Sequence, residues 1–181
     1  MEDDLSLATG EESDEQGDEF VPDLVNFQTP PPLCAYMVSL IPARYRRRSL
    51  IVEPTPGAGN MLTALAQAGF HQVESPPADF FRWSPTRQPS VVIGNPPWSP
   101  MTLAYEILDR ILTEFQPDLV VVLVPWLTLI NSTRRTRTLV NYGLQRVVHM
   151  PRWVFAGIRA QCCLLVLERG YRGTTELEFY E

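Results

Sequence analysis

An asparagine, two prolines and a tryptophan follow a short apolar run in the middle of the chain. The run at 90–94 leads directly into Asn95, Pro96, Pro97 and Trp98. Successive prolines fix the backbone and remove two N–H donors, which leaves a carboxamide, backbone carbonyls and a flat indole ring. These groups can accept the hydrogens of an amino group on a planar ring and stack on its face. A proline-rich turn with a packing tryptophan is the structural alternative.

A second group of polar and glycine residues follows an earlier apolar run, where we predict a strand. Its members are Glu53, Pro54, Gly57, Gly59 and Asn60. Glycines in such a turn let backbone N–H groups approach a ligand closely, because no Cβ intervenes. A Gly-x-Gly turn alone is weak evidence, but a strand and an acidic residue in front of it supply the expected context.

A third motif, Phe27-Gln28-Thr29-Pro30, precedes both groups. In this order, Phe-x-Thr-Pro, Glu-Pro-x-x-Gly-x-Gly and Asn-Pro-Pro-Trp resemble the layout of S-adenosylmethionine-dependent DNA adenine-N6 methyltransferases, over residues 26–169. The resemblance implies a Rossmann-like methyltransferase fold and S-adenosylmethionine as the cofactor. It also implies methyl transfer to the N6 amine of adenine in DNA, with the base flipped out or single-stranded.

The resemblance also assigns roles to individual residues. The implied catalytic residues are Asn95, Pro96, Pro97 and Trp98. The implied cofactor contacts are Phe27, Thr29, Pro30, Glu53, Pro54, Gly57, Gly59, Asn60, Glu74, Asp79, Phe80 and Asn95. Among these, Glu74 would accept hydrogen bonds from a ribose, Asp79 would contact the N6 of the cofactor's adenine, and Phe80 would stack on it. A solvated charge for Glu74 and core packing for Phe80 are the structural alternatives.

Alternating apolar segments and short connections predict an α/β fold. We expect strands near 49–54, 71–75, 90–95, 118–125, 145–150 and 161–168, and helices near 33–41, 59–69, 101–116 and 131–141. This alternation predicts a mostly parallel sheet with helices on both faces. The last two strands are joined too closely for a helical crossover, so we expect a C-terminal antiparallel hairpin. In such sheets, ligands bind at the carboxyl ends of the strands.

The charge of the chain is divided unevenly. Residues 1–23 hold ten of the 21 acidic residues and no basic one, so we expect a disordered acidic tail ahead of a catalytic domain at 24–181. The fifteen basic residues are all arginine. Clusters at 44–48 and 134–137 are candidate phosphate contacts, and a solvated charged surface is an equal alternative.

Composition limits the remaining classes of function. Three cysteines and two histidines lack the spacing of a disulfide framework or a zinc site, so we predict no metal. The sequence contains no apolar run of eighteen residues and starts acidic, so we expect a soluble intracellular protein, cytoplasmic or nuclear, without a membrane partner.

The sequence is compatible with several substrates. DNA is the first expectation and RNA the second, and a protein glutamine is a weaker one because Phe-x-Thr-Pro fits adenine enzymes better. A catalytically inactive subunit that binds nucleic acid or a partner is the non-enzymatic alternative. We find no room for a target-recognition region between Trp98 and the strand at 118–125. We therefore expect recognition by a partner subunit or a homodimer, or an unselective enzyme.

Overall fold

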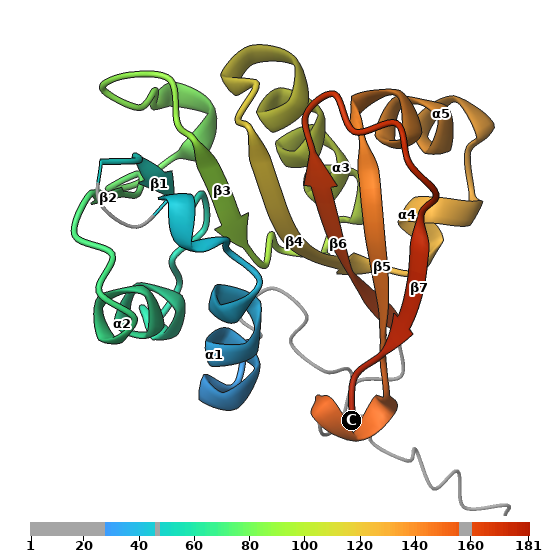
Figure 1. The fold of residues 1–181 in the computed structure, drawn as a ribbon, viewed down its shortest axis with the longest axis horizontal. Helices are drawn as coiled ribbons and strands as arrows, with labels where there is room; N and C mark the ends of the chain where they lie inside the picture. Colours follow the sequence, from blue (N-terminus) through green and yellow to red (C-terminus); the bar gives the residue numbers. More distant parts are fainter. Residues whose placement is uncertain (1–27, 46–47, 156–160) are drawn as a thin grey trace, which may run out of the picture.

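Seven strands form one sheet in the computed structural model, which describes residues 28–45, 48–155 and 161–181. Helices cover both faces of this sheet (Figure 1), as the sequence predicts for an α/β protein. Phe27 and the acidic segment at 1–23 lie outside the described residues. Within the described ranges, no helix is long and apolar enough to cross a lipid bilayer.

The sheet is mostly parallel, and β6 is its antiparallel strand. Its strands, in spatial order, are β2 (Val73–Glu74), β1 (Ile51–Val52), β3 (Val91–Gly94), β4 (Leu119–Pro125), β6 (Cys162–Glu168), β5 (Leu144–Met150) and β7 (Glu176–Phe179). The pairs among β2, β1, β3 and β4 are parallel. Strand β6 runs antiparallel to both β4 and β5, which confirms the predicted hairpin.

Two separate apolar cores lie on the two faces of the sheet. The helices are α1 (Pro31–Ser39), α2 (Asn60–Gln67), α3 (Met101–Arg110) with the π turn η3 (Ile111–Phe115), α4 (Leu127–Ile130) and α5 (Thr133–Tyr142). Helices α1 and α2 pack on one face, and α3 and α5 pack on the other. The side chains of β4 alternate between the two cores and are all buried, as expected for a central strand without polar alternation.

Several elements differ from the sequence-based expectation. Strands β1 and β2 are two residues long, shorter than predicted, because within the predicted ranges only Ile51–Val52 and Val73–Glu74 pair with each other. Helix α4 precedes the predicted helix at 131–141, and Ser132 caps α5 with its side chain. Strand β7 is an additional strand that pairs in parallel with β5, where Arg146 contacts Glu176 and Glu178.

Candidate active site

A cavity of about 470 Å³ opens at the carboxyl ends of β1 and β3. Its volume falls within the range of small-molecule sites. It brings together most of the residues that the sequence singled out. The predicted residues that line it are Thr29, Glu53, Pro54, Gly57, Asn60, Asp79, Phe80, Asn95, Pro96, Pro97 and Trp98. Because β1 and β3 are parallel neighbours, the residues that follow them meet at one edge of the sheet.

The glycine turn is tied to the segment in front of α1. The backbone N–H of Ala58 donates to Gln28 Oε1 over 2.9 Å, and Asn60 Nδ2 donates to the Thr29 carbonyl over 3.0 Å. Gly57 has a φ of +50°, and a Cβ there would lie 2.7 Å from Gln28 Oε1. The first and second motifs of the sequence therefore form one wall of the cavity.

Glu53 is a buried acid in the floor of this site. Glu53 is 1% exposed, its Oε1 accepts a hydrogen bond from the backbone N–H of Thr55 at 2.9 Å, and the Thr55 hydroxyl lies 3.4 Å from the same oxygen. Burial raises the pKa of Glu53 to about 8, although the neighbouring N–H and hydroxyl of Thr55 act in the opposite direction. A carboxyl of this kind is poised to ionise when a cationic ligand enters.

Asn95 presents an unsatisfied acceptor. Its side-chain oxygen Oδ1 is buried and has no hydrogen-bond partner among the described residues. Buried side-chain oxygens are paired in most proteins, so an unpaired one in a cavity wall needs an explanation. An amino group of a ligand would satisfy it.

Trp98 is mostly buried, although it lines the cavity. Its side chain is 8% exposed and belongs to the core that α1 and α2 cover. Its ring meets that of Phe155 edge to face, with 6.0 Å between the centroids. Packing and stacking on a base were the two alternatives for Trp98, and the structure shows that most of its ring packs in the core.

The loop that follows β2 also lines the cavity. Asp79 caps the short helix η2 (Phe80–Arg82) by accepting the backbone N–H of Phe81 at 2.9 Å, and its other oxygen lies 3.5 Å from Arg82 Nε. Phe80 is buried against Phe115, with the Arg110 guanidinium over both rings. Phe81 is 41% exposed and also lines the cavity.

Three predicted residues lie away from the cavity lining. Glu74 uses its carboxylate within the fold, since it accepts hydrogen bonds from the backbone N–H and the hydroxyl of Thr86. Gly59 has a φ of +86° and stands at the N-terminus of α2. Pro30 stands at the N-terminus of α1. Their assignment to the cofactor stays a prediction.

Sequence reasoning missed several lining residues. Gln28, Thr55 and Phe81 line the cavity with the predicted set. The position of Gln28 inside the first motif and of Thr55 inside the second could have signalled both. Phe81 directly follows Phe80, and the sequence does not show which of the two rings is exposed.

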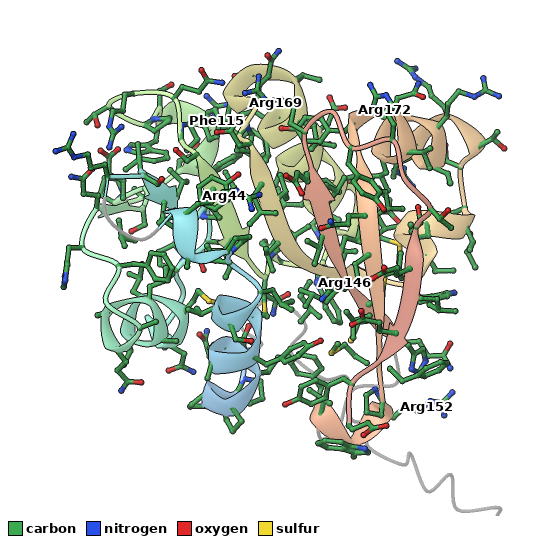
Figure 2. All side chains as sticks on the ribbon, in the orientation of Figure 1. Arg44, Phe115, Arg146, Arg152, Arg169 and Arg172 are labelled. Carbon is green, nitrogen blue, oxygen red and sulfur yellow. The ribbon has the colours of Figure 1, made fainter. Side chains whose placement is uncertain are left out.

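The candidate phosphate-binding arginines are dispersed. Arg44 pairs with Glu168 at 2.9 Å, and Arg135 stacks on the ring of Tyr105 at 3.5 Å, while residues 46–47 are outside the described part. Outside the predicted clusters, Figure 2 shows Arg169 and Arg172 at the upper edge of the molecule and Arg152 at its lower end. In the described ranges, no group of three or more metal-ligating side chains gathers.

No protein-family model and no curated protein sequence matches the chain, but solved structures do. A putative class I S-adenosylmethionine-dependent methyltransferase from Listeria monocytogenes superposes with a TM-score of 0.66 and 14% identity, over 89% of this chain and 68% of that one. The fold is that of the Rossmann-like methyltransferases.

Two further structures share this methyltransferase fold. One is a modification subunit of a putative type I restriction enzyme from Vibrio vulnificus, with a TM-score of 0.61 and 18% identity over 85% of this chain. The other is the 23S rRNA methyltransferase ErmE, with a TM-score of 0.56 and 16% identity over 81% of this chain and 71% of that one. This chain spans 46% of the length of the modification subunit. The methyltransferase fold is thus shared with proteins named for DNA restriction and for RNA modification.

Proposed function

We propose that this protein transfers a methyl group from S-adenosylmethionine to the N6 amine of adenine in DNA. The observation that carries the proposal is the buried, unpaired Oδ1 of Asn95 in the wall of a strand-end cavity. An amino group on a planar base is the donor that this carboxamide oxygen lacks. The shared fold with methyltransferases supports the reaction class.

Several residues that line the cavity suit S-adenosylmethionine. Glu53 would place a buried carboxyl beside the ammonium group of the cofactor. Gly57 belongs to the glycine turn, and Asn60 follows it as the first residue of α2. Asp79 and Phe80 offer an acceptor and a ring to its adenine. When bound, the cofactor supplies an electrophilic methyl group on a sulfonium. Thr29 and Pro54, two further predicted contacts, also line the cavity.

The part of the cavity lined by Asn95 and Trp98 would hold the target base. The exocyclic amine of adenine is a poor nucleophile, because its lone pair is delocalised into the ring. Hydrogen bonds to Asn95 Oδ1 and to the Pro96 carbonyl would localise that pair on nitrogen. Catalysis then consists of positioning and electrostatics, without a covalent enzyme intermediate.

The base must leave the stack to reach this edge. Enzymes that act on a base take it out of the duplex or use single strands. Trp98 lines the cavity beside Asn95, and Pro97 holds the backbone between Pro96 and that ring. We propose that the part of the Trp98 indole that faces the cavity contacts the target base, while the rest of it stays packed on Phe155.

Sequence recognition is proposed to come from outside the described domain. The chain spans about half of a type I modification subunit, whose name places it in a larger restriction enzyme. A partner subunit or a second copy of this chain would then choose the target sequence, and DNA is the nucleic-acid partner.

The test is a methyl-transfer assay with labelled S-adenosylmethionine. Duplex DNA, single-stranded DNA and RNA are incubated with the wild type, with Asn95→Ala, and with Asn141→Ala as a matched control on the exposed end of α5. Digestion to nucleosides identifies N6-methyladenine and the polymer that carries it. We expect label in DNA, lost in Asn95→Ala and kept in Asn141→Ala. An active Asn95→Ala variant would falsify the role of this side chain.

RNA is the second candidate substrate, and the fold shared with a 23S rRNA methyltransferase favours it. Label found only in RNA would establish this alternative. With no label in any polymer, a measurement of cofactor affinity separates the two remaining explanations. Tight binding indicates a missing partner, and no binding indicates a subunit that has lost catalysis.

A further inference from the structure

Thr55 joins the two halves of the candidate site through one hydroxyl group. Its Oγ1 lies 3.4 Å from Glu53 Oε1 and 3.2 Å from the backbone carbonyl oxygen of Asn95. Forty positions separate Thr55 from Asn95 in the sequence, and β1 and β3 bring them together. The contact between Thr55 Oγ1 and the Asn95 carbonyl therefore links the loop after β1 to the backbone of Asn95.

The hydroxyl has a single hydrogen to donate, and the Asn95 carbonyl is its better acceptor. Glu53 Oε1 already accepts the backbone N–H of Thr55 at 2.9 Å. The shorter distance from Oγ1 also belongs to the Asn95 carbonyl. The hydrogen bond therefore runs from Thr55 to Asn95.

This hydrogen bond is made to a peptide group that has no N–H of its own. Residue 96 is a proline, so the peptide between Asn95 and Pro96 has a carbonyl and no N–H. A donor on that carbonyl is the only hydrogen bond that can fix the orientation of the peptide plane. The plane carries the Asn95 side chain on one end and leads to the Pro96 carbonyl on the other.

We propose that Thr55 is a positioning residue, which holds the Asn95–Pro96 peptide so that its two acceptors converge on one amino group. The proposal rests on the proposed function for the role of these acceptors. Thr55 itself donates to the backbone and not to the substrate. Its loss should therefore slow transfer and leave cofactor binding nearly unchanged.

Two substitutions separate the hydroxyl from the shape of the side chain. Thr55→Val keeps the shape and removes the donor, and Thr55→Ser keeps the donor and removes a methyl group. Thr63→Val is the matched control, because Thr63 is exposed on α2 and outside the cavity lining. The net value of one hydrogen bond predicts that Thr55→Val lowers the single-turnover transfer rate about tenfold. Thr55→Ser and Thr63→Val should stay within about threefold of the wild type on the same scale.

The experiment measures the transfer rate, the cofactor dissociation constant and the melting temperature of each variant. A slow Thr55→Val with an unchanged dissociation constant, and recovery in Thr55→Ser, supports the proposal. A Thr55→Val variant as fast as an active wild type overturns it. Equal losses in Thr55→Val and Thr55→Ser, together with lower melting temperatures, also overturn it, because they indicate a packing role.

A second readout does not depend on activity. The side-chain amide of Asn95 gives a pair of signals in a ¹⁵N-labelled protein, which the Asn95→Ala variant identifies. We expect these signals to shift or broaden in Thr55→Val and to return in Thr55→Ser. If the wild type methylates no polymer, the proposed function fails while this readout still decides whether Thr55 positions Asn95. Unchanged Asn95 signals in Thr55→Val would overturn the positioning role.

Discussion

Gly94 lies directly against the carboxyl of Glu53. A Cβ at Gly94 would lie 2.5 Å from Glu53 Oε1 and 3.1 Å from Pro54 Cδ. The end of β3 can therefore approach the end of β1 only because residue 94 has no side chain. This close approach places the acid of the second motif next to the backbone that carries Asn95.

Gly94→Ala should destabilise the fold, because the added methyl group collides with a buried carboxyl. We expect a loss of about 2 kcal/mol in the free energy of unfolding, as for other overpacked cores. Chemical denaturation measures it. The same substitution in a Glu53→Ala background should cost clearly less, since that background removes the colliding atoms. Equal costs in the two backgrounds would show that Glu53 is not the obstacle.

Gly57→Ala should weaken cofactor binding, whereas Gly69→Ala should not. Both glycines have positive φ values, +50° and +81°, so both variants should lose about 1 kcal/mol of stability from backbone strain. A Cβ at Gly57 would also displace Gln28 from the glycine turn, but a Cβ at Gly69 meets nothing within 4 Å. Calorimetric titration with S-adenosylmethionine compares them. Parallel effects on affinity would contradict a direct role of the turn.

The buried acid should make stability fall as the pH rises. Glu53 has an ordinary pKa of 4.5 and a folded-state pKa of about 8, so the folded chain binds the extra proton between these values. The unfolded chain then holds fewer protons, and the contribution of Glu53 to stability is lost as the pH rises through the folded pKa. Between pH 6 and pH 8, the loss should be roughly 2 kcal/mol.

Glu53→Gln is the matched variant for this pH dependence, since its side chain has a similar shape and does not titrate. The difference in unfolding free energy between wild type and variant, measured without cofactor, should move in favour of the variant from pH 6 to pH 8. If that difference is constant over this range, Glu53 does not carry a raised pKa.

Trp98→Ala should cost far more stability than Phe81→Ala, although both residues line the cavity. Trp98 is 8% exposed and packs on Phe155, whereas Phe81 is 41% exposed. Truncation of a buried tryptophan costs about 3–5 kcal/mol, and truncation of the half-exposed phenylalanine should cost about 1 kcal/mol or less. Thermal unfolding tests the order of the two losses. The reverse order would contradict the buried position of Trp98.

Local sequence signals predicted the fold class and most strands, because they reflect short-range physics. The unbroken apolar run of β4 predicted a strand that is buried on both faces. The short link between β5 and β6 predicted their antiparallel pairing. Strand β7 was missed because its Glu-Leu-Glu-Phe pattern is short, and its partner strand β5 lies far away in sequence.

The sequence by itself also determined which residues gather at the candidate site. Glu53 and Asn95 each follow an apolar strand, and parallel neighbouring strands end at the same edge of a sheet. Only the tertiary structure decided how each side chain is used. It engaged Glu74 with Thr86, buried Trp98 against Phe155, and placed the Thr55 hydroxyl beside the Asn95 carbonyl. These side-chain contacts join segments that are separated in the sequence, so residue types and local spacing do not reveal them.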